Sequence, residues 1–289
     1  MKILLVGGTS LVSQYLMPLL TEIGTVITAG RKNCDLFVDL SDSSKSLIMP
    51  KGIDVLIHTA AQFGGNSFEE IDTTLAVNTQ GTLRLCEAAH QSGVKHFLLI
   101  SSIFSHLESS SPFYNIYSIS KKQGEEVAKF YCKIKSIPLT ILRPSQIYGN
   151  DSHFRAHHPF FYSVIDQAQK GEIISFYGSH DALRNFIHIE DLSKIILKCI
   201  AKGVTGEFDC AHPQNISYSE IAKAAIAAFK SQSEIQFLKE KPSIVDNIFK
   251  SNDTLYERLG FWPQIGILEG MVNIAKHRNS EILTKAQSR

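Results

Sequence analysis

The sequence predicts an α/β fold: a doubly wound parallel sheet with a smaller, mostly C-terminal second domain. Short apolar runs typical of strands alternate with longer helical segments, and the runs are apolar on both faces, as in sheets covered on both sides. With 289 residues, 44% of them hydrophobic, the chain is long enough for two cores. We expect the first domain to span residues 1–145 plus about 183–200, and the second about 146–182 plus 201–289.

The strands are expected where aliphatic and β-branched residues cluster. In chain order these runs are 3–7, 25–30, 34–40, 54–60, 96–101 and 139–145. The segments between them predict helices at about 11–21, 69–91 and 114–136. Parallel sheets of this kind bind ligands beyond the carboxyl ends of their strands, so candidate site residues are expected just after each strand.

Composition excludes several function classes. The formal net charge of +1 gives no reason for binding nucleic acid or anionic lipid. No apolar run approaches the ~18–20 residues of a membrane helix, and because a strand is expected directly after Met1, we expect no signal peptide. The five cysteines form no C-x-x-C pair, and adjacent His157 and His158 cannot easily converge on one ion. We expect a cytoplasmic protein without a metal site.

The first strand runs into residues 7–13, GGTSLVS, which predict a tight turn at the start of a helix. Gly7 satisfies the turn, and a helix N-terminus suits a phosphate group. Ser10 can cap the helix or donate to a phosphate oxygen, whereas Ser13 lies where the helix packs near the strand. Taken alone, the motif is equally compatible with a turn that binds nothing. The candidate cofactor contacts here are Gly7, Thr9, Ser10, Leu11 and Val12.

The ends of the next two strands carry charged residues. Arg31 follows the second strand at the position where an NAD site usually has Asp or Glu, and an arginine suits the 2′-phosphate of NADP. Asp39 and Leu40 end the third strand, where a carboxylate can meet the adenine amine. An Asp in this position is also a common turn former.

The strongest pattern follows the fifth strand, which ends at Ser101 and Ser102. Fifteen residues beyond Ser102 lie Tyr117 and Lys121, one helical turn apart on one face. A lysine ammonium near a phenol is expected to lower the pKa of the tyrosine, which then exchanges protons near neutral pH. With Ser102 orienting the substrate oxygen, these groups suit hydride transfer at a carbon that carries oxygen.

Further segments extend this pattern over nearly the whole chain. They are DVLIHTAA (54–61), VNTQGTLRLCEAA (77–89), LRPSQIYG (142–149), FYGSHDALRNFIHIEDL (176–192) and ERLGFWPQIGILEGM (257–271). Together with the Ser-Tyr-Lys set, they resemble the extended short-chain dehydrogenase/reductase family, in the branch that acts on nucleotide sugars. In that family the first turn reads Gly-x-x-Gly-x-x-Gly, so Ser10 and Ser13 are departures.

The resemblance implies a Rossmann-like fold and a role for each matching segment. A nucleotide-diphosphate sugar is the implied substrate, Arg184 its diphosphate contact, and a homodimer formed through two helices of each subunit the implied assembly. The catalytic residues are Ser102, Tyr117 and Lys121, and Ser102 also contacts the substrate. The further cofactor contacts implied are Arg31, Asp39, Leu40, Thr59, Ala60, Ala61, Asn78, Ser101, Tyr117, Lys121, Pro144 and Ile147.

The residues after Ser102 narrow the chemistry. Ile103 and Phe104 stand where the 4,6-dehydratases of the family carry Asp and Glu, and Phe104 stands where the epimerase-reductases carry a cysteine. Two enzymatic alternatives remain: a 4-ketoreductase for a 4-keto-6-deoxy sugar with exchangeable NADP(H), and a 4-epimerase with tightly bound NAD. Arg31 favours NADP(H) and the reductase. The alternative of another class is a non-catalytic dinucleotide-binding sensor or scaffold.

Overall fold

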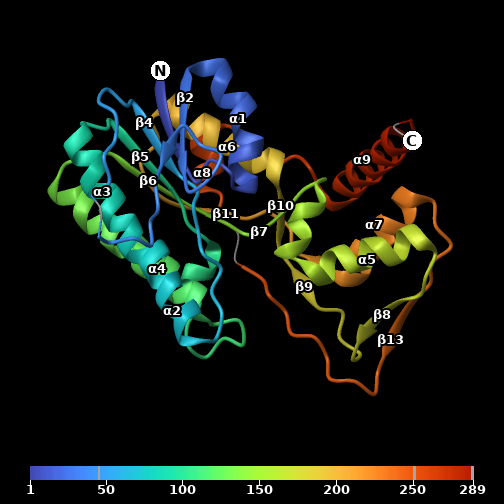
Figure 1. Ribbon diagram of the computed structural model, residues 1–289. Helices are drawn as coiled ribbons and strands as arrows, with labels where there is room; N and C mark the ends of the chain where they lie inside the picture. The colour runs from blue at the N-terminus through green and yellow to red at the C-terminus, as the bar shows by residue number, and fades with distance from the viewer. Residues whose placement is uncertain (45, 250–251, 288–289) are drawn as a thin grey trace. The chain divides into compact units, whose positions relative to one another are not determined.

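Seven parallel strands form the main sheet of the protein, seen in a computed structural model that describes residues 1–44, 46–249 and 252–287, with side chains to residue 280. The order across the sheet is β11-β6-β5-β4-β1-β2-β3 (Figure 1). The strands are β1 (Lys2–Val6), β2 (Thr25–Gly30), β3 (Leu36–Phe37), β4 (Val55–His58), β5 (His96–Ile100), β6 (Leu139–Pro144) and β11 (Gly206–Cys210). This arrangement confirms the predicted doubly wound parallel sheet.

The strand order reverses at β1, which pairs with β2 on one side and β4 on the other. Val6 at the end of β1 lies opposite Ala29 of β2 and His58 of β4. At such a reversal the connections leave the sheet on opposite faces, and a crevice opens beyond the strand ends. The segments that follow β1 and β4 are therefore placed to meet a ligand.

Helices cover both faces of the sheet, with α1 on one side and α3 and α4 on the other (Figure 1). The helical elements of this part are α1 (Leu11–Ile23), α2 (Phe68–Leu75), the π turn η1 (Ala76–Gln80), α3 (Gly81–Ser92), the 3₁₀ turn η2 (Ile103–His106), α4 (Ile116–Ile134), α6 (Ile189–Lys202) and α8 (Thr254–Leu259). The helix predicted at about 69–91 is present as a contiguous helical segment over 68–92, in which the π turn separates α2 from α3. The turn contains Asn78, whose side chain bonds to two neighbouring segments, a typical setting for such an interruption.

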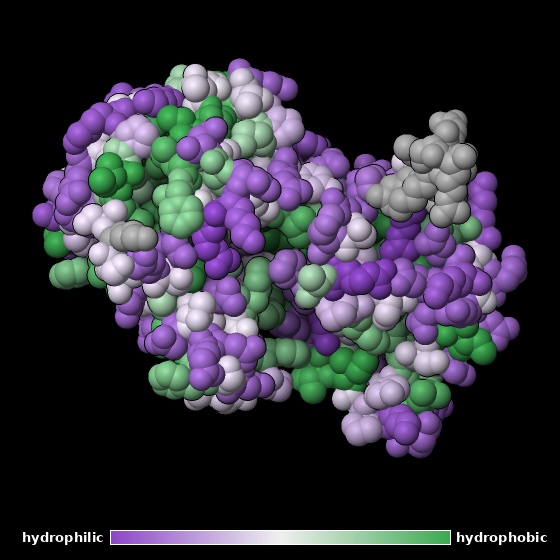
Figure 2. All heavy atoms as spheres, viewed as in Figure 1, coloured by the Kyte–Doolittle hydropathy of each residue, from purple (hydrophilic) through white to green (hydrophobic). Residues whose placement is uncertain are grey.

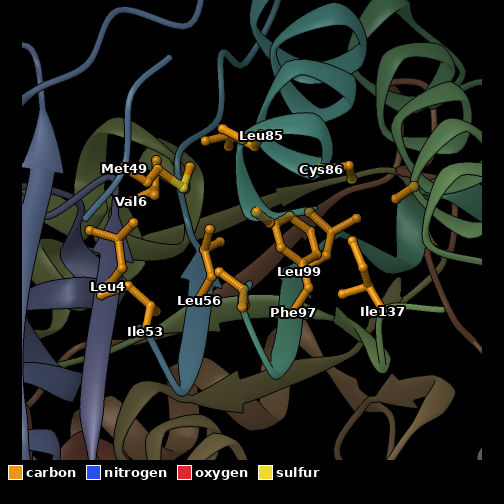
Figure 3. Packing of buried hydrophobic residues seen from close by; sticks show 14 of the residues in the cluster. Leu4, Val6, Met49, Ile53, Leu56, Leu85, Cys86, Phe97, Leu99 and Ile137 are labelled. Atoms are coloured by element: carbon orange, nitrogen blue, oxygen red, sulfur yellow. The ribbon is translucent and has the colours of Figure 1, made fainter. Parts of the chain in front are cut away.

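The core between the sheet and α3 follows from the alternation of strand side chains. Leu4 and Val6 of β1 and Phe97 and Leu99 of β5 belong to one buried cluster, and Leu85 of α3 belongs to it as well (Figure 3). Successive strand residues point to opposite faces, so the residues between them point to the other face of the sheet. Both faces of the strands are thus buried, which holds the strand ends at a fixed edge.

Two compact units divide the described chain. The first consists of 1–145, 193–210 and 252–261, and the second of 146–192, 211–251 and 262–289, as far as those ranges are described. The segments that return to the first unit are thus 193–210 and 252–261, where the sequence suggested about 183–200. The second unit contains β7 (Gln146–Tyr148), η3 (Ser152–Ala156), α5 (Pro159–Lys170), β8 (Ile174–Tyr177), β9 (Leu183–Arg184), β10 (Phe186–His188), β12 (Ile216–Ser217), α7 (Tyr218–Phe229), β13 (Ile235–Leu238) and α9 (Ile267–Gln287).

The visible surface carries hydrophilic side chains with smaller hydrophobic areas between them (Figure 2). Within residues 1–44, 46–249 and 252–287, no helix is both long enough and apolar enough to cross a bilayer. In the same ranges, no group of three or more His, Cys, Asp or Glu side chains is arranged to hold a metal ion.

Candidate functional site

The turn after β1 has a backbone that only glycine tolerates. Gly7 has φ of +88°, and a Cβ there would lie 2.5 Å from the backbone nitrogen of Ala60, which follows β4. The Gly7 N–H donates to the Ala29 carbonyl at 2.8 Å. The ends of β1, β2 and β4 are therefore in close backbone contact at the reversal of the sheet.

Helix α1 begins directly after this turn and leaves backbone donors for a ligand. Ser10 caps the helix, its Oγ accepting the Ser13 N–H at 3.1 Å. The first helical hydrogen bond runs from the Gln14 N–H to the Ser10 carbonyl, so the N–H groups of Leu11 and Val12 precede it. Such free donors at the positive end of the helix dipole bind phosphate. The glycine turn and the helix start thus fit a dinucleotide pyrophosphate.

The ends of β2 and β3 place opposite charges near each other. Arg31 is exposed, and Asp39 is half-buried. Hydrogen bonds from Ser41 lower the pKa of Asp39, and the positive charge of Arg31 adds to this effect. Leu40 is buried beside Gly81 at the start of α3, where its carbonyl accepts from Arg84. Arg31 is therefore an accessible cation at the β2 end, whereas the Leu40 side chain is a packing residue.

Asn78 fixes the loop that follows β4. Its amide nitrogen donates to the Gln62 carbonyl at 2.7 Å and to the Ser120 hydroxyl at 2.9 Å, and its oxygen accepts the Gln62 N–H at 2.8 Å. Both of its N–H donors are used inside the protein, so the structure gives Asn78 a supporting role. Ala60 and Ala61 stand at the start of this loop, next to Gly7 in the case of Ala60.

The three candidate catalytic side chains meet between β5 and α4. Ser102 follows β5, and Tyr117 lies in the first turn of α4, close enough for the Ser102 hydroxyl to lower the pKa of its phenol. Lys121 lies one turn further along, with Nζ 6.0 Å from the centre of the Tyr117 ring. It donates to the carbonyl of Ile100 at 2.9 Å. The convergence expected from the sequence is thus present in the geometry.

The electrostatics of this cluster differ from the expectation. Burial raises the pKa of Tyr117 to about 12, and the hydrogen bond with Ser102 acts in the opposite direction. Burial lowers the pKa of Lys121 to about 8, with the charge of Glu125 opposing this shift. The expectation that Tyr117 exchanges protons near neutral pH was wrong, because desolvation of the phenol outweighs the influences that lower its pKa. The phenol therefore keeps its proton at neutral pH.

His58, at the end of β4, lies close to the same cluster and stays neutral. Burial and, to a smaller extent, the positive charge of Lys121 together lower its pKa to about 3. Its Nε2 lies 3.2 Å from the hydroxyl of Thr82. Lys121 is thus surrounded by a neutral imidazole, a neutral phenol and the carboxylate of Glu125.

The sequence analysis missed a buried ion pair behind Lys121. Glu125 lies one helical turn after Lys121, is buried, and accepts from the Ser101 hydroxyl at 2.5 Å. Arg143 of β6 donates to it with Nε at 2.9 and 3.0 Å and with Nη2 at 2.6 Å. Lys121 and Glu125 therefore hold two successive residues at the end of β5, next to Ser102. The signal was the continuation of the Tyr117 and Lys121 spacing by another four residues.

A second missed residue is Phe63, in the loop after β4. Its ring stacks on Tyr117 with centres 5.3 Å apart and planes inclined by 19°, yet it is 56% exposed. The loop is fixed on both sides of it. Gln62 is bonded to Asn78, and the Asn66 N–H donates to Glu70 at 2.9 Å. Phe63 is thus a rigidly presented aromatic side chain beside the candidate proton donor.

The remaining candidates are placed as follows. Pro144 ends β6 in the first unit, and Ile147 lies in β7 of the second, opposite Ile187. Arg184 is buried in β9; its Nε donates to the Tyr218 hydroxyl at 3.0 Å and its Nη1 to the Val245 carbonyl at 2.7 Å. The guanidinium is thus already bonded within its own unit, and its contact with a substrate diphosphate stays a prediction.

The sequence of this chain is similar to those of known proteins. The sequence profile of the NAD dependent epimerase/dehydratase family matches residues 3–211. The chain is 28% identical over 253 residues to human dTDP-D-glucose 4,6-dehydratase, covering 81% of this chain and 71% of the relative. It is 25% identical over 231 residues to dTDP-4-dehydro-6-deoxy-D-allose reductase of a Streptomyces species, covering 73% and 70%.

Solved structures share the fold at low identity. The Bordetella bronchiseptica enzyme WbmF in complex with NAD+ superposes with a TM-score of 0.80 at 19% identity, over 99% of this chain and 94% of the other. RMD from Pseudomonas aeruginosa complexed with NADPH gives 0.77 at 19% identity, over 97% and 99%. Both cover the two units of this chain.

Proposed function

Because this chain belongs to the NAD dependent epimerase/dehydratase family, we propose that it is a nucleotide-sugar 4-ketoreductase that uses NADP(H) and a 4-keto-6-deoxy sugar. Its homologues are nucleotide-sugar dehydratases, epimerases and reductases. The observation that carries the proposal is the cluster of Ser102, Tyr117 and Lys121, flanked by side chains that exchange no protons.

Those flanking side chains argue against dehydration, although the human relative is a 4,6-dehydratase. Ile103 is buried, and Phe104 presents a hydrocarbon ring next to Ser102, to which its N–H donates at 3.2 Å. Neither can remove or add a proton at a sugar carbon, whereas elimination of water needs an acid and a base at adjacent carbons. A reductase needs one proton donor, and Tyr117 supplies it.

The cofactor is a nicotinamide dinucleotide. The residues that would bind it lie where the strand order reverses at β1. Gly7 and the N–H groups of Leu11 and Val12 would receive the pyrophosphate. Relatives of the same fold are bound to NAD+ or to NADPH. The exposed Arg31 at the β2 end favours the 2′-phosphate of NADPH. The cofactor supplies the hydride.

The protein side of the reaction is a proton transfer. Ser102 hydrogen-bonds the carbonyl oxygen of the substrate, and the Tyr117 hydroxyl donates its proton to that oxygen as negative charge develops there. The ammonium of Lys121 stabilises the phenolate that remains. Phe63 covers one face of the Tyr117 ring and keeps water from it.

The test is NADPH oxidation followed by absorbance in the presence of a dTDP- or UDP-4-keto-6-deoxyhexose. We expect turnover by the wild-type protein and a kcat lower by about 10²–10⁴ in Tyr117→Phe. Purified protein that retains NAD and interconverts UDP-hexoses without net oxidation would identify an epimerase instead. Binding of cofactor without either reaction would identify a sensor.

We further propose that the protein is a homodimer formed through α3 and α4. Phe130 and Ile134 lie one turn apart on α4 and are exposed, as is Leu83 on α3. Exposed apolar residues at helical spacing are typical of a surface that a second copy covers. Light scattering is expected to give twice the mass of the chain for wild type and the monomer mass for Phe130→Glu.

A further inference from the structure

Three hydroxyl groups meet beneath the cofactor turn, at the positions where the chain departs from the glycine pattern. Ser13 Oγ lies 2.8 Å from Thr59 Oγ1, and Ser10 Oγ lies 3.0 Å from Thr59 Oγ1 and 3.1 Å from Ser13 Oγ. Ser13 is fully buried and Thr59 is buried. Ser10 and Ser13 belong to the start of α1, whereas Thr59 follows β4, so the cluster joins two elements far apart in sequence.

The direction of these bonds follows from what each oxygen touches. The Thr59 hydroxyl donates to the backbone carbonyls of Val6, at 3.0 Å, and Gly7, at 3.2 Å. Because its proton is used in this way, its oxygen accepts from the serines. Ser13 then donates to Thr59, and Ser10 donates within the cluster while its oxygen caps the Ser13 N–H. Every hydroxyl proton is thus used inside the protein. Thr59 is the common partner that ties the end of β1 to the start of α1.

We propose that Thr59 is a positioning residue for the dinucleotide: its hydroxyl fixes the start of α1 against the ends of β1 and β4. The inference concerns the cofactor turn and rests on the proposed function only in that a dinucleotide binds there. A glycine at position 13 would let the helix approach the strand directly. With Ser13 the hydroxymethyl group needs room, and the bond to Thr59 gives that buried group a partner and the helix a fixed position.

If Thr59 has this role, the affinity for the dinucleotide depends on the position of the start of α1. The N–H groups of Leu11 and Val12 must keep their position relative to Gly7 to bind both ends of a pyrophosphate. Without the Thr59 hydroxyl, Ser13 loses its acceptor and the carbonyls of Val6 and Gly7 lose a donor. The start of α1 is then free to shift, while Ser102, Tyr117 and Lys121, which lie on other elements, stay in place.

The experiment compares Thr59→Val with Thr59→Ser and with Thr140→Val. Valine keeps the shape of threonine and removes the hydroxyl, and serine restores it. Thr140 is a buried threonine on β6 whose hydroxyl donates to the Val204 carbonyl and lies 2.7 Å from His96 Nε2, so its valine variant also loses a bonded, buried hydroxyl, but away from the turn. The Kd of NADPH is measured by fluorescence titration. The kcat and the KM for NADPH are measured at a saturating concentration of the keto sugar.

We expect the Kd of NADPH to rise about tenfold in Thr59→Val, the effect of about one lost hydrogen bond, with kcat at saturating NADPH within twofold of wild type. Thr59→Ser and Thr140→Val are expected to bind NADPH as wild type does. If Thr59→Val does not fold, Ser13→Ala removes the same bond from the other side and is expected to raise the Kd alike.

An unchanged Kd in Thr59→Val would overturn the proposal, and so would an equal rise in Thr140→Val. A fall in kcat that matches the loss of affinity would assign Thr59 a general structural role instead. Because the titration needs no sugar, a protein that binds NADPH but reduces no keto sugar would refute the proposed function and leave this test intact.

Discussion

The turn after β1 is built from backbone groups and small hydroxyls, whereas the cluster after β5 is built from long charged and aromatic side chains. At the turn, Gly7 lies against the backbone of Ala60, and bonds of about 3 Å between hydroxyls hold the helix start. At the cluster, Lys121 and Glu125 reach across to hold the end of β5. The first region depends on where the backbone lies, and the second on which side chains are present and how they are charged.

Removing the Tyr117 hydroxyl, the proposed proton donor, is expected to have the largest effect on activity. Tyr117→Phe keeps the ring that stacks on Phe63 and removes only the hydroxyl. We expect kcat to fall by about 10²–10⁴, as for other general acids, with the Kd of NADPH unchanged. The matched control is Tyr114→Phe, a more exposed tyrosine three residues earlier. A loss of NADPH affinity in Tyr117→Phe would show that the two regions do not act separately.

A charge change at the end of β2 sharpens the description of the turn. We expect Arg31→Ala to raise the KM for NADPH about tenfold and leave that for NADH unchanged, since only NADPH offers a second phosphate for the guanidinium. Lys32→Ala, at an equally exposed neighbour, controls for general attraction of anions. Equal effects on both cofactors would remove the basis for preferring NADPH.

The aromatic contact with Tyr117 is the next feature to remove. We expect Phe63→Ala to lower kcat/KM about fivefold, since an aromatic pair contributes about 1 kcal/mol and water then reaches the phenol. Phe68→Ala is the matched control, because Phe68 is 77% exposed on the neighbouring helix α2. If both variants behave as wild type, Phe63 has no part in catalysis.

The approach of Ser102, Tyr117 and Lys121 to one another could be predicted from the sequence, because it follows from residue types and their spacing. Once the sheet is recognised, Ser102 is expected at the end of a strand. Tyr117 and Lys121, one turn apart on the next helix, are then expected beside it. The sheet was recognised from its apolar runs, which β1, β4 and β5 match closely. Placing Tyr117 and Lys121 on one helix face needed only the helical repeat.

Whether the turn after β1 can bind a dinucleotide could not be judged from the sequence in this way. A glycine pattern reflects backbone angles and close distances between segments, which residue types alone do not give. Ser10 and Ser13 break the pattern in the sequence, yet Thr59, 46 residues beyond Ser13, supplies the contact that accommodates them. The π turn within 68–92 likewise contains Asn78, whose side chain bonds Gln62, 16 residues earlier in the sequence. The pKa of Tyr117 was also out of reach, since the spacing to Lys121 says nothing of desolvation.

The smallest expected effect concerns the charge behind Lys121. Protonated Lys121 stabilises the phenolate, and its pKa of about 8 in the fold predicts that kcat falls as the pH rises through this value. Since the charge of Glu125 raises the pKa of Lys121, Glu125→Gln is expected to move this fall to lower pH. Activity near pH 8 then drops about threefold, while activity near pH 6.5 stays close to wild type. The profile of kcat between pH 6 and 9 measures this.

Glu126→Gln separates this effect from a general change in the charge of α4. Glu126 is the next residue on the helix, has a side chain that is 64% exposed, and pairs with Lys129 at 2.7 Å. Solvent screens such an exposed charge, so its removal is expected to leave the pH profile unchanged. A uniform loss of activity at all pH values in Glu125→Gln would indicate instead that the carboxylate acts through its bonds to Ser101 and Arg143. The cluster would then depend on fixed positions, as the turn does, rather than on charge.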